Sequence, residues 1–208
     1  MAASSQTRTR LAVDTRREQL LHAGAELLRT NTPDEISIHS VAQKAGISRG
    51  LLYHYFEDRD AFIIAVLEQA SDELRMALRP DQSLGERDQI AGAIDAFITF
   101  AEAHAAGFRA VLTGGVTNRK IAAVVDETRE RDLARFVALI ASTTGKGMDA
   151  RDHDLLRVAL HAHMHFMEGA VVRWLSRDEI TRGQLRELIL RALEGTIVAA
   201  KAVASRGP

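Results

Sequence analysis

Residues 37–62 read SIHSVAQKAGISRGLLYHYFEDRDAF, and this stretch contains the pattern most typical of one fold. Ser37 is a residue type that caps helix N-termini, and the segment after it has apolar residues on one helical face: Ile38, Val41, Ala42 and Ala45. Gly46 follows where a left-handed C-terminal residue is needed, and Ser48 can cap a second helix from Arg49 to about Tyr55. Two short helices joined by a glycine-containing turn are typical of a helix-turn-helix, although many helical proteins contain such a pair.

Hydrophobic periodicity predicts helices on both sides of this stretch. The first runs from Arg16 to Thr30 and ends before Pro33, because proline forces its predecessor out of the helical region. Asp58 can cap a fourth helix that Pro80 stops at about Arg79. Five more helices are expected. The fifth begins at a Ser83/Glu86 capping box and ends before Gly107, the sixth runs from Phe108 to Thr113, and the seventh begins after a Thr117 cap. After a loop at 145–147, the eighth runs from Asp152 to Ser176, and the ninth runs from a Thr181/Gln184 capping box to near Ala204.

Composition supports an all-α fold of about nine helices. Aromatic residues make up only 5% of the chain, whereas strand-rich proteins enrich aromatic and β-branched residues. The chain has no cysteine, which excludes disulfides and thiolate metal sites, and no apolar run has the length of a membrane span. We therefore expect a soluble, cytoplasmic protein. The net charge is −1, but residues 1–56 carry seven basic against five acidic side chains, a modest excess that is compatible with nucleic-acid binding.

The segment from Thr15 to Ala70 resembles the DNA-binding head of the TetR family of transcriptional regulators. The matching residues are Val41-Ala42, Ala45-Gly46-Ile47-Ser48, Gly50, Leu52-Tyr53, Phe56 and Ala61-Phe62. Two residues depart from the family pattern: Leu51 stands where a small hydroxyl residue is common, and Arg59 where lysine is usual. The resemblance is strong over the first third and architectural elsewhere. It implies a three-helix, homeodomain-like head with a basic N-terminal arm (residues 1–57) and a six-helix ligand-binding and dimerisation body (residues 58–208).

The residue types on and around the second helix of the motif suit DNA recognition. Arg49 can donate two hydrogen bonds to guanine in the major groove, and Leu51 can pack on a thymine methyl. Gly50 permits close approach, while Tyr53 and His54 can donate to phosphate. Residues at helix starts or exposed edges are expected to contact phosphates too: Ser37, His39, Lys44, Ser48 and Arg59. Each of these residues can instead be an ordinary cap or surface residue.

The family resemblance implies a small-molecule pocket in the body. Candidate lining residues are Phe97, Phe100, His104, Phe108, Leu112, His161, Met164, His165, Phe166, Met167 and Glu168. Methionine and phenylalanine on facing helices make an adaptable apolar cavity, although such residues are more often plain core. His161 and His165 share a helix face at i and i+4, with Glu168 one turn beyond, so a metal site is conceivable. Buried, hydrogen-bonded histidines are the simpler interpretation, and no metal or cofactor is expected.

The last two predicted helices have apolar residues on more than one face, so something must cover them. A second copy of the chain is the economical answer, and a hairpin buried within its own monomer is the alternative. Small residues would let the helices of two copies approach closely. The candidate interface comprises Gly169, Ala170, Arg173, Trp174, Leu188, Ala192, Gly195, Thr196 and Ala199.

Taken together, these features predict a repressor that binds an inverted-repeat operator in double-stranded DNA as a homodimer and is released by a small, largely apolar inducer. A small helical enzyme is a competing class, but the sequence contains no nucleophile elbow, phosphate loop or zinc-hydrolase pair. A helical adaptor whose helix-turn-helix is only structural is a third class. Strong preference for one palindrome over bulk DNA would separate the first class from the other two.

Overall fold

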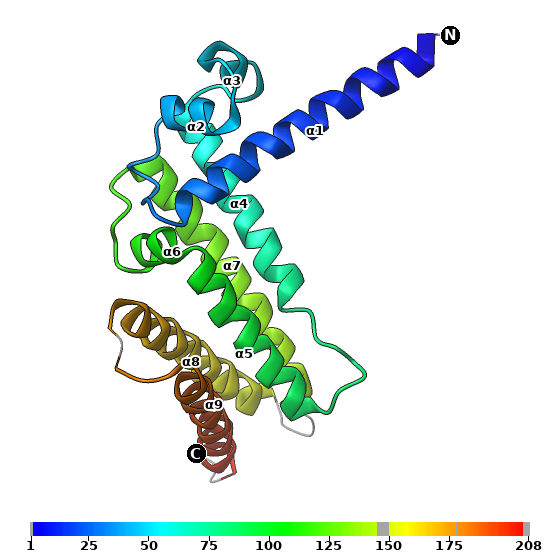
Figure 1. Cartoon of the computed structure of the whole chain (residues 1–208). Coiled ribbons are helices and arrows are strands. Elements are labelled where there is room, and N and C mark those ends of the chain that lie inside the picture. Colours follow the sequence, from blue (N-terminus) through cyan, green and yellow to red (C-terminus); the bar gives the residue numbers. More distant parts are fainter. Residues whose placement is uncertain (1, 145–149, 178, 206–208) are drawn as a thin grey trace. The chain divides into compact units, whose positions relative to one another are not determined.

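The computed structural model describes residues 2–144, 150–177 and 179–205, and the regular elements in these ranges are helices (Figure 1). The expected all-α fold of about nine helices is confirmed for this part of the chain, while the expected loop at 145–147 lies outside it. None of the helices in the described ranges has both the length and the apolar character of a membrane span. The helices are α1 (Ala2–Leu28), α2 (Ile38–Ala45), α3 (Arg49–Tyr55), α4 (Arg59–Ala77), α5 (Glu86–Ala103), α6 (Ala105–Leu112), α7 (Arg119–Thr144), α8 (Ala150–Ser176) and α9 (Arg182–Ala204).

These helices belong to two compact units. The first comprises Met1–Glu73 and Ala103–Val125, and the second comprises Leu74–Glu102 and Asp126–Pro208. The unit with the helix-turn-helix therefore also includes α6 and the beginning of α7, and both α4 and α7 contribute to two units. The functional division at residue 57 remains a prediction.

Three local signals set the helix-turn-helix in the first unit, and all three predictions are confirmed. Ser37 caps α2, because its Oγ accepts from the backbone N–H of Ser40 at 3.0 Å and its own N–H donates to the Ser40 hydroxyl. Gly46 ends α2 with a φ of 65°, a left-handed conformation that costs glycine little. Ser48 caps α3, because its Oγ accepts from the N–H of Leu51 at 3.2 Å.

The core of the first unit depends on a close crossing of α1 and α4. A Cβ atom at Gly24 would lie 2.5 Å from Val66 Cγ2 and 2.8 Å from Phe62 Cζ, so only glycine fits there without displacing α4 side chains. Phe62 in turn packs edge to face on Phe56, with ring centroids 5.0 Å apart. The buried cluster around these residues comprises Leu20, Leu21, Leu28, Ile36, Ile38, Val41, Leu52, Phe56, Phe62, Ile63, Ala65, Val66 and Ile121.

The first helix is longer than the periodicity predicted. α1 begins at Ala2 instead of Arg16, so the segment expected to be a basic arm belongs to a helix. No proline or glycine interrupts the chain before Gly24, and the apolar period marks only the part of a helix that packs on a core. The C-terminal end is close to expectation, because Leu27 O accepts from both the backbone and the side chain of Asn31.

The capping box predicted to open the fifth helix is wrong. α5 begins at Glu86, which places Gly85 directly before it, and the Ser83 hydroxyl donates to Asp81 Oδ1 at 2.6 Å. An aspartate two residues earlier competes for the serine, and sequence spacing does not reveal this. The boundary between α5 and α6 also lies earlier than expected, because α6 already begins at Ala105.

The cap predicted for the seventh helix is displaced by one residue. Asn118 Oδ1 accepts from the backbone N–H groups of Lys120 at 3.0 Å and Ile121 at 3.2 Å, so Asn118 caps α7. The predicted cap, Thr117, instead donates from its hydroxyl to Asp34 at 2.5 Å. Both residue types cap helices well, and a contact distant in sequence decides between them.

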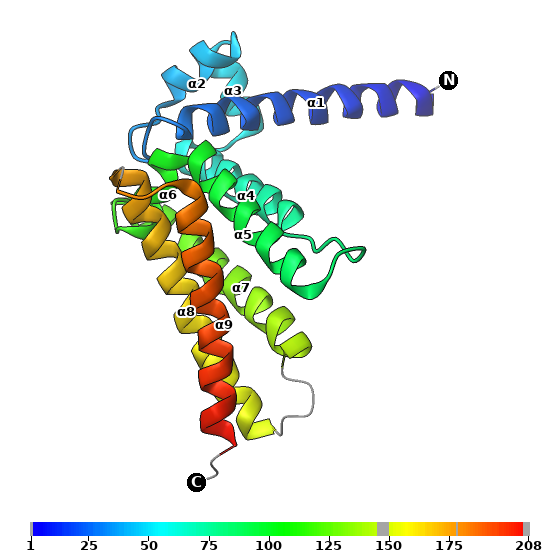
Figure 2. The same cartoon turned by 60° about the horizontal axis from the view of Figure 1, so that its bottom comes forward.

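In the second unit, α8 and α9 lie side by side, as both views show (Figures 1 and 2). The predicted capping box of α9 is confirmed, because Thr181 Oγ1 accepts from the N–H of Gln184 at 3.2 Å and the Gln184 side chain accepts from Thr181 N. The two helices bury one face each. The buried residues are Leu156, Leu160, Met164, Met167, Val171, Leu185, Ile189, Leu190, Leu193 and Ala200.

His163 is a polar residue in this apolar interior. Its side chain is buried, with 4% of the residue exposed, and its Nε2 has no hydrogen-bond partner among the described residues. Burial lowers the pKa of His163 to about 4, so the imidazole is neutral near pH 7. An unsatisfied buried nitrogen typically costs about 1–3 kcal/mol, so His163 does not serve stability.

We predict that His163 makes the protein acid-sensitive. The unfolded chain binds a proton at its ordinary pKa of about 6.5, whereas the folded chain does so only near pH 4. The free energy of unfolding should therefore fall as pH drops from about 6.5 to about 4. His163→Leu should remove this component, which urea titrations of both proteins across that range would show. Parallel pH curves for variant and wild type would contradict the prediction.

Candidate nucleic-acid interface

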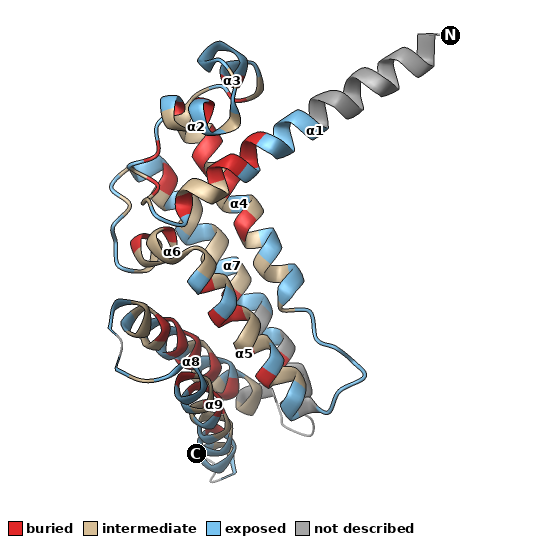
Figure 3. Ribbon diagram, viewed as in Figure 1, coloured by how far each residue is buried: buried red, intermediate tan, exposed pale blue. Residues whose placement is uncertain are grey.

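Helix α3 is anchored by few residues and exposes the others. Leu52 is fully buried within α3, and Phe56 is buried directly after its end. The remaining outward residues are exposed, including Tyr53 with 53% of its surface accessible (Figure 3). The exposed set includes the predicted base-reading and phosphate-binding positions on this helix: Arg49, Gly50, Leu51, Tyr53 and His54. Gly50 has open space where a Cβ would be, so a partner can approach the backbone closely.

The neighbouring helix α2 contributes further exposed donors. Ser37 and His39 at its start are exposed, as are Lys44 near its end and Ser48 at the start of α3. Backbone N–H groups at the first turns of α2 and α3 carry partial positive charge, which favours phosphate. Neither α2 nor α3 contains an acidic residue, so both helices expose hydrogen-bond donors without a carboxylate of their own.

Arg59 has an intramolecular role that the sequence did not indicate. Its guanidinium donates to three backbone carbonyls and one carboxylate: Ile36 O at 2.7 Å, Pro33 O at 2.6 Å, Asp34 O at 2.9 Å and Asp60 Oδ1 at 3.2 Å. These bonds occupy four of its five N–H groups. Arg59 thereby joins the start of α4 to the turn before α2, and only one donor is left for the predicted phosphate contact.

A second arginine stabilises the end of α3. The Arg17 guanidinium carbon lies 5.3 Å from the centroid of the Phe56 ring, a cation–π contact between α1 and the residue that closes α3. The neighbouring Arg16 donates to Gln19 at 2.8 Å along α1. The apolar periodicity predicts that both arginines lie in the first helix, but nothing in their spacing reveals the aromatic partner.

Polar contacts join the helix-turn-helix to the start of α7 within the first unit. Asp34 Oδ2 accepts from the backbone N–H of Thr117 at 2.7 Å and from its hydroxyl at 2.5 Å. Chiefly through the hydroxyl bond, Thr117 lowers the pKa of Asp34, which stays ionised. Two further pairs link α7 to the beginning of α4: Asn118 with Asp60 at 2.9 Å and Lys120 with Asp58 at 3.4 Å. These partners are more than fifty residues apart in sequence, so no local pattern predicts them.

The predicted ligand-binding residues fall into both units. His104, Phe108 and Leu112 belong to the first unit and are partly buried, and burial lowers the pKa of His104. The other predicted residues belong to the second unit, where they differ in exposure. Phe97, Met164, Met167 and Glu168 are buried, Phe100 and His161 are partly buried, and His165 and Phe166 are exposed.

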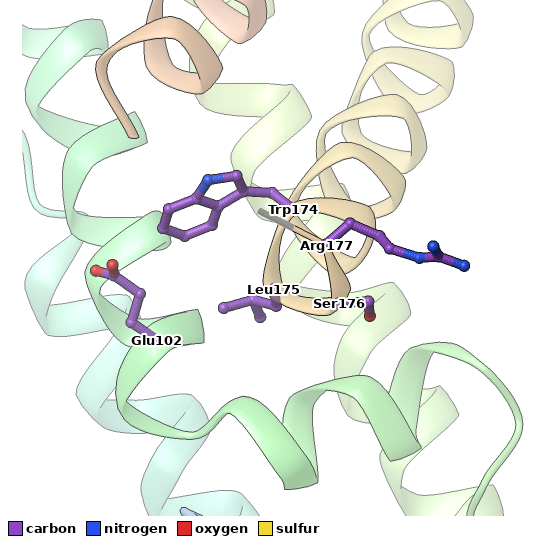
Figure 4. Close-up of a pocket in the computed structure, with 5 residues that line it drawn as sticks. All are labelled: Glu102, Trp174, Leu175, Ser176 and Arg177. Carbon is purple, nitrogen blue, oxygen red and sulfur yellow. The ribbon is translucent and has the colours of Figure 1, made fainter. Parts of the chain in front are cut away.

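The second unit contains an open pocket that the sequence did not predict. Its volume is about 370 Å³, and its walls come from Glu102 of α5 and from the C-terminal end of α8 (Figure 4). The Trp174 indole donates to the carbonyl of Ile180 at 2.9 Å, which fixes the ring as one wall. The lining residues are Glu102, Trp174, Leu175, Ser176 and Arg177.

The predicted dimer residues lie on the outer parts of α8 and α9. Gly169, Gly195, Leu188 and Ala199 are exposed, and nothing lies within 4 Å of a Cβ placed on either glycine. Ala170, Trp174, Ala192 and Thr196 are partly buried. Arg173 is exposed and forms an ion pair with Glu179 at 2.5 Å.

Comparison with known proteins adds several named relatives. FasR of Mycolicibacterium smegmatis, an HTH-type transcriptional activator, is 29% identical over 182 residues, covering 85% of this chain and 80% of its own length. BetI of Stenotrophomonas maltophilia, an HTH-type transcriptional regulator, is 31% identical over 101 residues, which are 47% of this chain and 52% of BetI. The crystal structure of a TetR-family regulator from Streptomyces coelicolor matches with a TM-score of 0.75 and 26% identity, covering 94% of this chain and 84% of that one.

Two family models match successive parts of the sequence. The model for bacterial regulatory proteins of the TetR family matches residues 20–66, which include the helix-turn-helix. The model for the tetracyclin repressor-like C-terminal domain matches residues 86–194, which are more than half of the chain. The chain therefore belongs to the TetR family of DNA-binding transcriptional regulators.

Proposed function

We propose that this regulator is a repressor that binds an inverted-repeat operator as a homodimer and leaves it when a small, largely apolar ligand binds the body. The observation that carries the proposal is the outward face of α3, where donor and apolar side chains are exposed around a glycine that has open space beside it. An exposed helix of this composition fits the major groove, where base edges present acceptors and methyl groups.

Each exposed residue of α3 has a distinct task in this proposal. Arg49, at the first position of the helix, reads a guanine, and Leu51 packs on a thymine methyl. Tyr53 and His54 bind phosphates and thereby orient the helix without reading sequence. The burial of Leu52 and Phe56 supports these assignments, because it directs the intervening side chains outward.

An exposed stripe on α8 and α9 supports the homodimer. On α9, Leu188, Ala192, Gly195 and Ala199 follow one another at intervals of three or four residues, and Leu188 is 48% exposed. On α8 the exposed apolar residues include Val158 and Phe166. Large exposed apolar residues beside small ones favour close packing against the same surface of a second copy.

The interior of the second unit supports a ligand that is mostly apolar but has a polar group. Met164 and Met167 are buried on α8 beside His163, and methionine adapts readily to different ligand shapes. A hydroxyl or carbonyl group of a ligand would provide the hydrogen-bond partner that Nε2 of His163 lacks among the described residues.

Activation of transcription is a second candidate, because FasR, which covers most of this chain, is named an activator. Both candidates require the same operator complex, and they differ in the effect on the target promoter. Deleting the coding region should raise transcription from that promoter if the protein is a repressor and lower it if the protein is an activator.

We predict different effects for two substitutions on α3. Tyr53→Phe removes one phosphate donor and should weaken binding to all sequences alike. Arg49→Ala should in addition relax the preference at one base pair by about 1–3 kcal/mol. Fluorescence anisotropy at fixed salt, with the inverted repeat upstream of the coding region and its single-base variants, measures both effects. Arg79→Ala, an exposed arginine outside the first unit, is the control and should bind normally. Wild-type binding by both α3 variants would exclude α3 as the reading helix.

We predict that Ala192→Arg separates the dimer, because it places an unpaired charge in the proposed interface, at a position that is already partly buried in the single chain. Sedimentation velocity should show a monomer for this variant and a dimer for the wild type. Ala134→Arg, the same change at an exposed position of α7, should leave the dimer intact. An unchanged dimer in the Ala192 variant would exclude this interface.

We predict that ligand and operator bind antagonistically. A thermal-shift screen of aliphatic and aromatic compounds should find molecules that stabilise the protein. Such a molecule should weaken operator binding, and the operator should weaken its binding by the same factor, typically about 5–150-fold. His163→Leu should reduce the response to hits that carry a hydroxyl or carbonyl group. Hits that stabilise the protein and leave operator affinity unchanged would contradict release by ligand.

A further inference from the structure

Helices α7 and α8 bring two histidines and a glutamate together on the surface of the second unit. His161 and His165 are one turn apart on α8, and Glu130 lies opposite them on α7. One ligand atom from each residue can be chosen so that all three lie within 4.8 Å of one another, and His161 Nε2 is 3.4 Å from Glu130 Oε2. We propose that these three residues form a Zn²⁺ site.

The distances require only small side-chain movements to reach zinc geometry. Zinc binds imidazole nitrogen and carboxylate oxygen at about 2.0–2.2 Å, so the ligand atoms of a tetrahedral site lie roughly 3.3 Å apart. The Glu130–His161 distance already has this value, and the third atom must approach by an ångström or more. The three side chains are between 41% and 56% exposed, so they can rotate without disturbing the core.

The ligand types favour zinc over the hard cations. Two imidazoles and one carboxylate form a nitrogen-rich set, whereas Mg²⁺ and Ca²⁺ prefer oxygen ligands. Three protein ligands on an exposed surface leave a fourth position for water, which completes a tetrahedron. The site joins α7 to α8, so a bound ion would cross-link two helices of the second unit.

A carboxylate beside the site can hold His165 in the metal-binding tautomer. Glu168 Oε2 lies 3.2 Å from His165 Nδ1, and Glu168 is itself largely buried. When Nδ1 carries the proton and donates to Glu168, the lone pair of Nε2 is available for the ion. Carboxylate–histidine–metal arrangements of this kind orient the ring in many metal sites.

Arg129 is a neighbouring cation that opposes metal binding, and Glu168 offsets its charge. Arg129 donates from Nε to Glu168 Oε1 at 3.0 Å and from Nη2 to Glu168 Oε2. The same Nη2 lies 2.9 Å from His165 Nδ1. His165 Nδ1 therefore has both a donor, Arg129 Nη2, and an acceptor, Glu168 Oε2, within hydrogen-bond distance. Zinc binding then requires a change of tautomer at His165, with Arg129 remaining on Glu168.

Zinc titration of the whole, untagged chain tests the proposal independently of any DNA binding. The protein is treated with a chelator, dialysed, and titrated with Zn²⁺ by calorimetry. We expect one ion per chain, and at about a hundred times the dissociation constant a rise in melting temperature of about 5–10 °C. Half an ion per chain would place the ion between two chains and overturn the site. No binding, or binding without stabilisation, would also overturn it.

Single substitutions identify the ligands. His161→Gln, His165→Gln and Glu130→Gln should each weaken Zn²⁺ binding about 10–100-fold or more. His22→Gln, a change at an exposed histidine of α1, should bind Zn²⁺ like the wild type. Circular dichroism confirms that each variant is folded. Equal Zn²⁺ affinity in the wild type and the three ligand variants would leave only an ordinary hydrogen-bond network between α7 and α8, and would overturn the proposal.

The absorption spectrum of Co²⁺ provides a second readout of the same site. Cobalt replaces zinc in nitrogen and oxygen sites and absorbs strongly in the visible range when it is four-coordinate. We expect such a spectrum for the wild type and the His22 variant, and its loss in both histidine variants of α8. The weak spectrum of six-coordinate Co²⁺ in the wild type would contradict a tetrahedral site.

Discussion

The edge-to-face packing of Phe56 on Phe62 holds together the part of the molecule that is proposed to read DNA. Phe56 closes α3, and Phe62 lies on α4 at the point where Gly24 lets α1 approach. Arg17 lies over the Phe56 ring in a cation–π contact. Because α3 is only seven residues long and buries only Leu52, this aromatic contact is what fixes the direction of its exposed face. A short helix with so few anchors depends on its neighbours for its orientation.

The helix-turn-helix is also connected to residues far along the chain. Arg59 ties α4 to the turn before α2, and Asp34 on that turn accepts two hydrogen bonds from Thr117. Each such bond contributes about 1 kcal/mol, much less than the apolar core, but together they fix the start of α7 within the first unit. A movement at the start of α7 can therefore reach the turn before α2 through the hydrogen bonds between Thr117 and Asp34. This route is a candidate pathway for the proposed control of the helix-turn-helix by a ligand.

The second unit combines features that oppose stability with features that support it. His163 leaves a buried nitrogen without a partner among the described residues, and the apolar stripe on α8 and α9 faces solvent in a single chain. Both are unfavourable in isolation, and both would become favourable with a partner, a ligand in one case and a second copy in the other. By contrast, the Arg129–Glu168 pair is satisfied within the unit and joins α7 to α8. We therefore assign ligand binding to His163 and dimerisation to the apolar stripe, because each destabilises a single chain without its partner.

Sequence patterns alone were enough to predict the helical class, the helix-turn-helix, its three caps and the outward face of α3. These features depend on periodicity and on contacts over three or four residues, which spacing encodes. Contacts in the folded chain determine that Asn118 and not Thr117 caps α7, that Arg59 donates to backbone carbonyls, and that Glu130 lies beside His161. Packing also gives the predicted ligand-binding residues different exposures: Met164 is buried and Phe166 is exposed, although both lie on α8. Such contacts join residues distant in the chain, and their partners are chosen by packing in space, which no local pattern records.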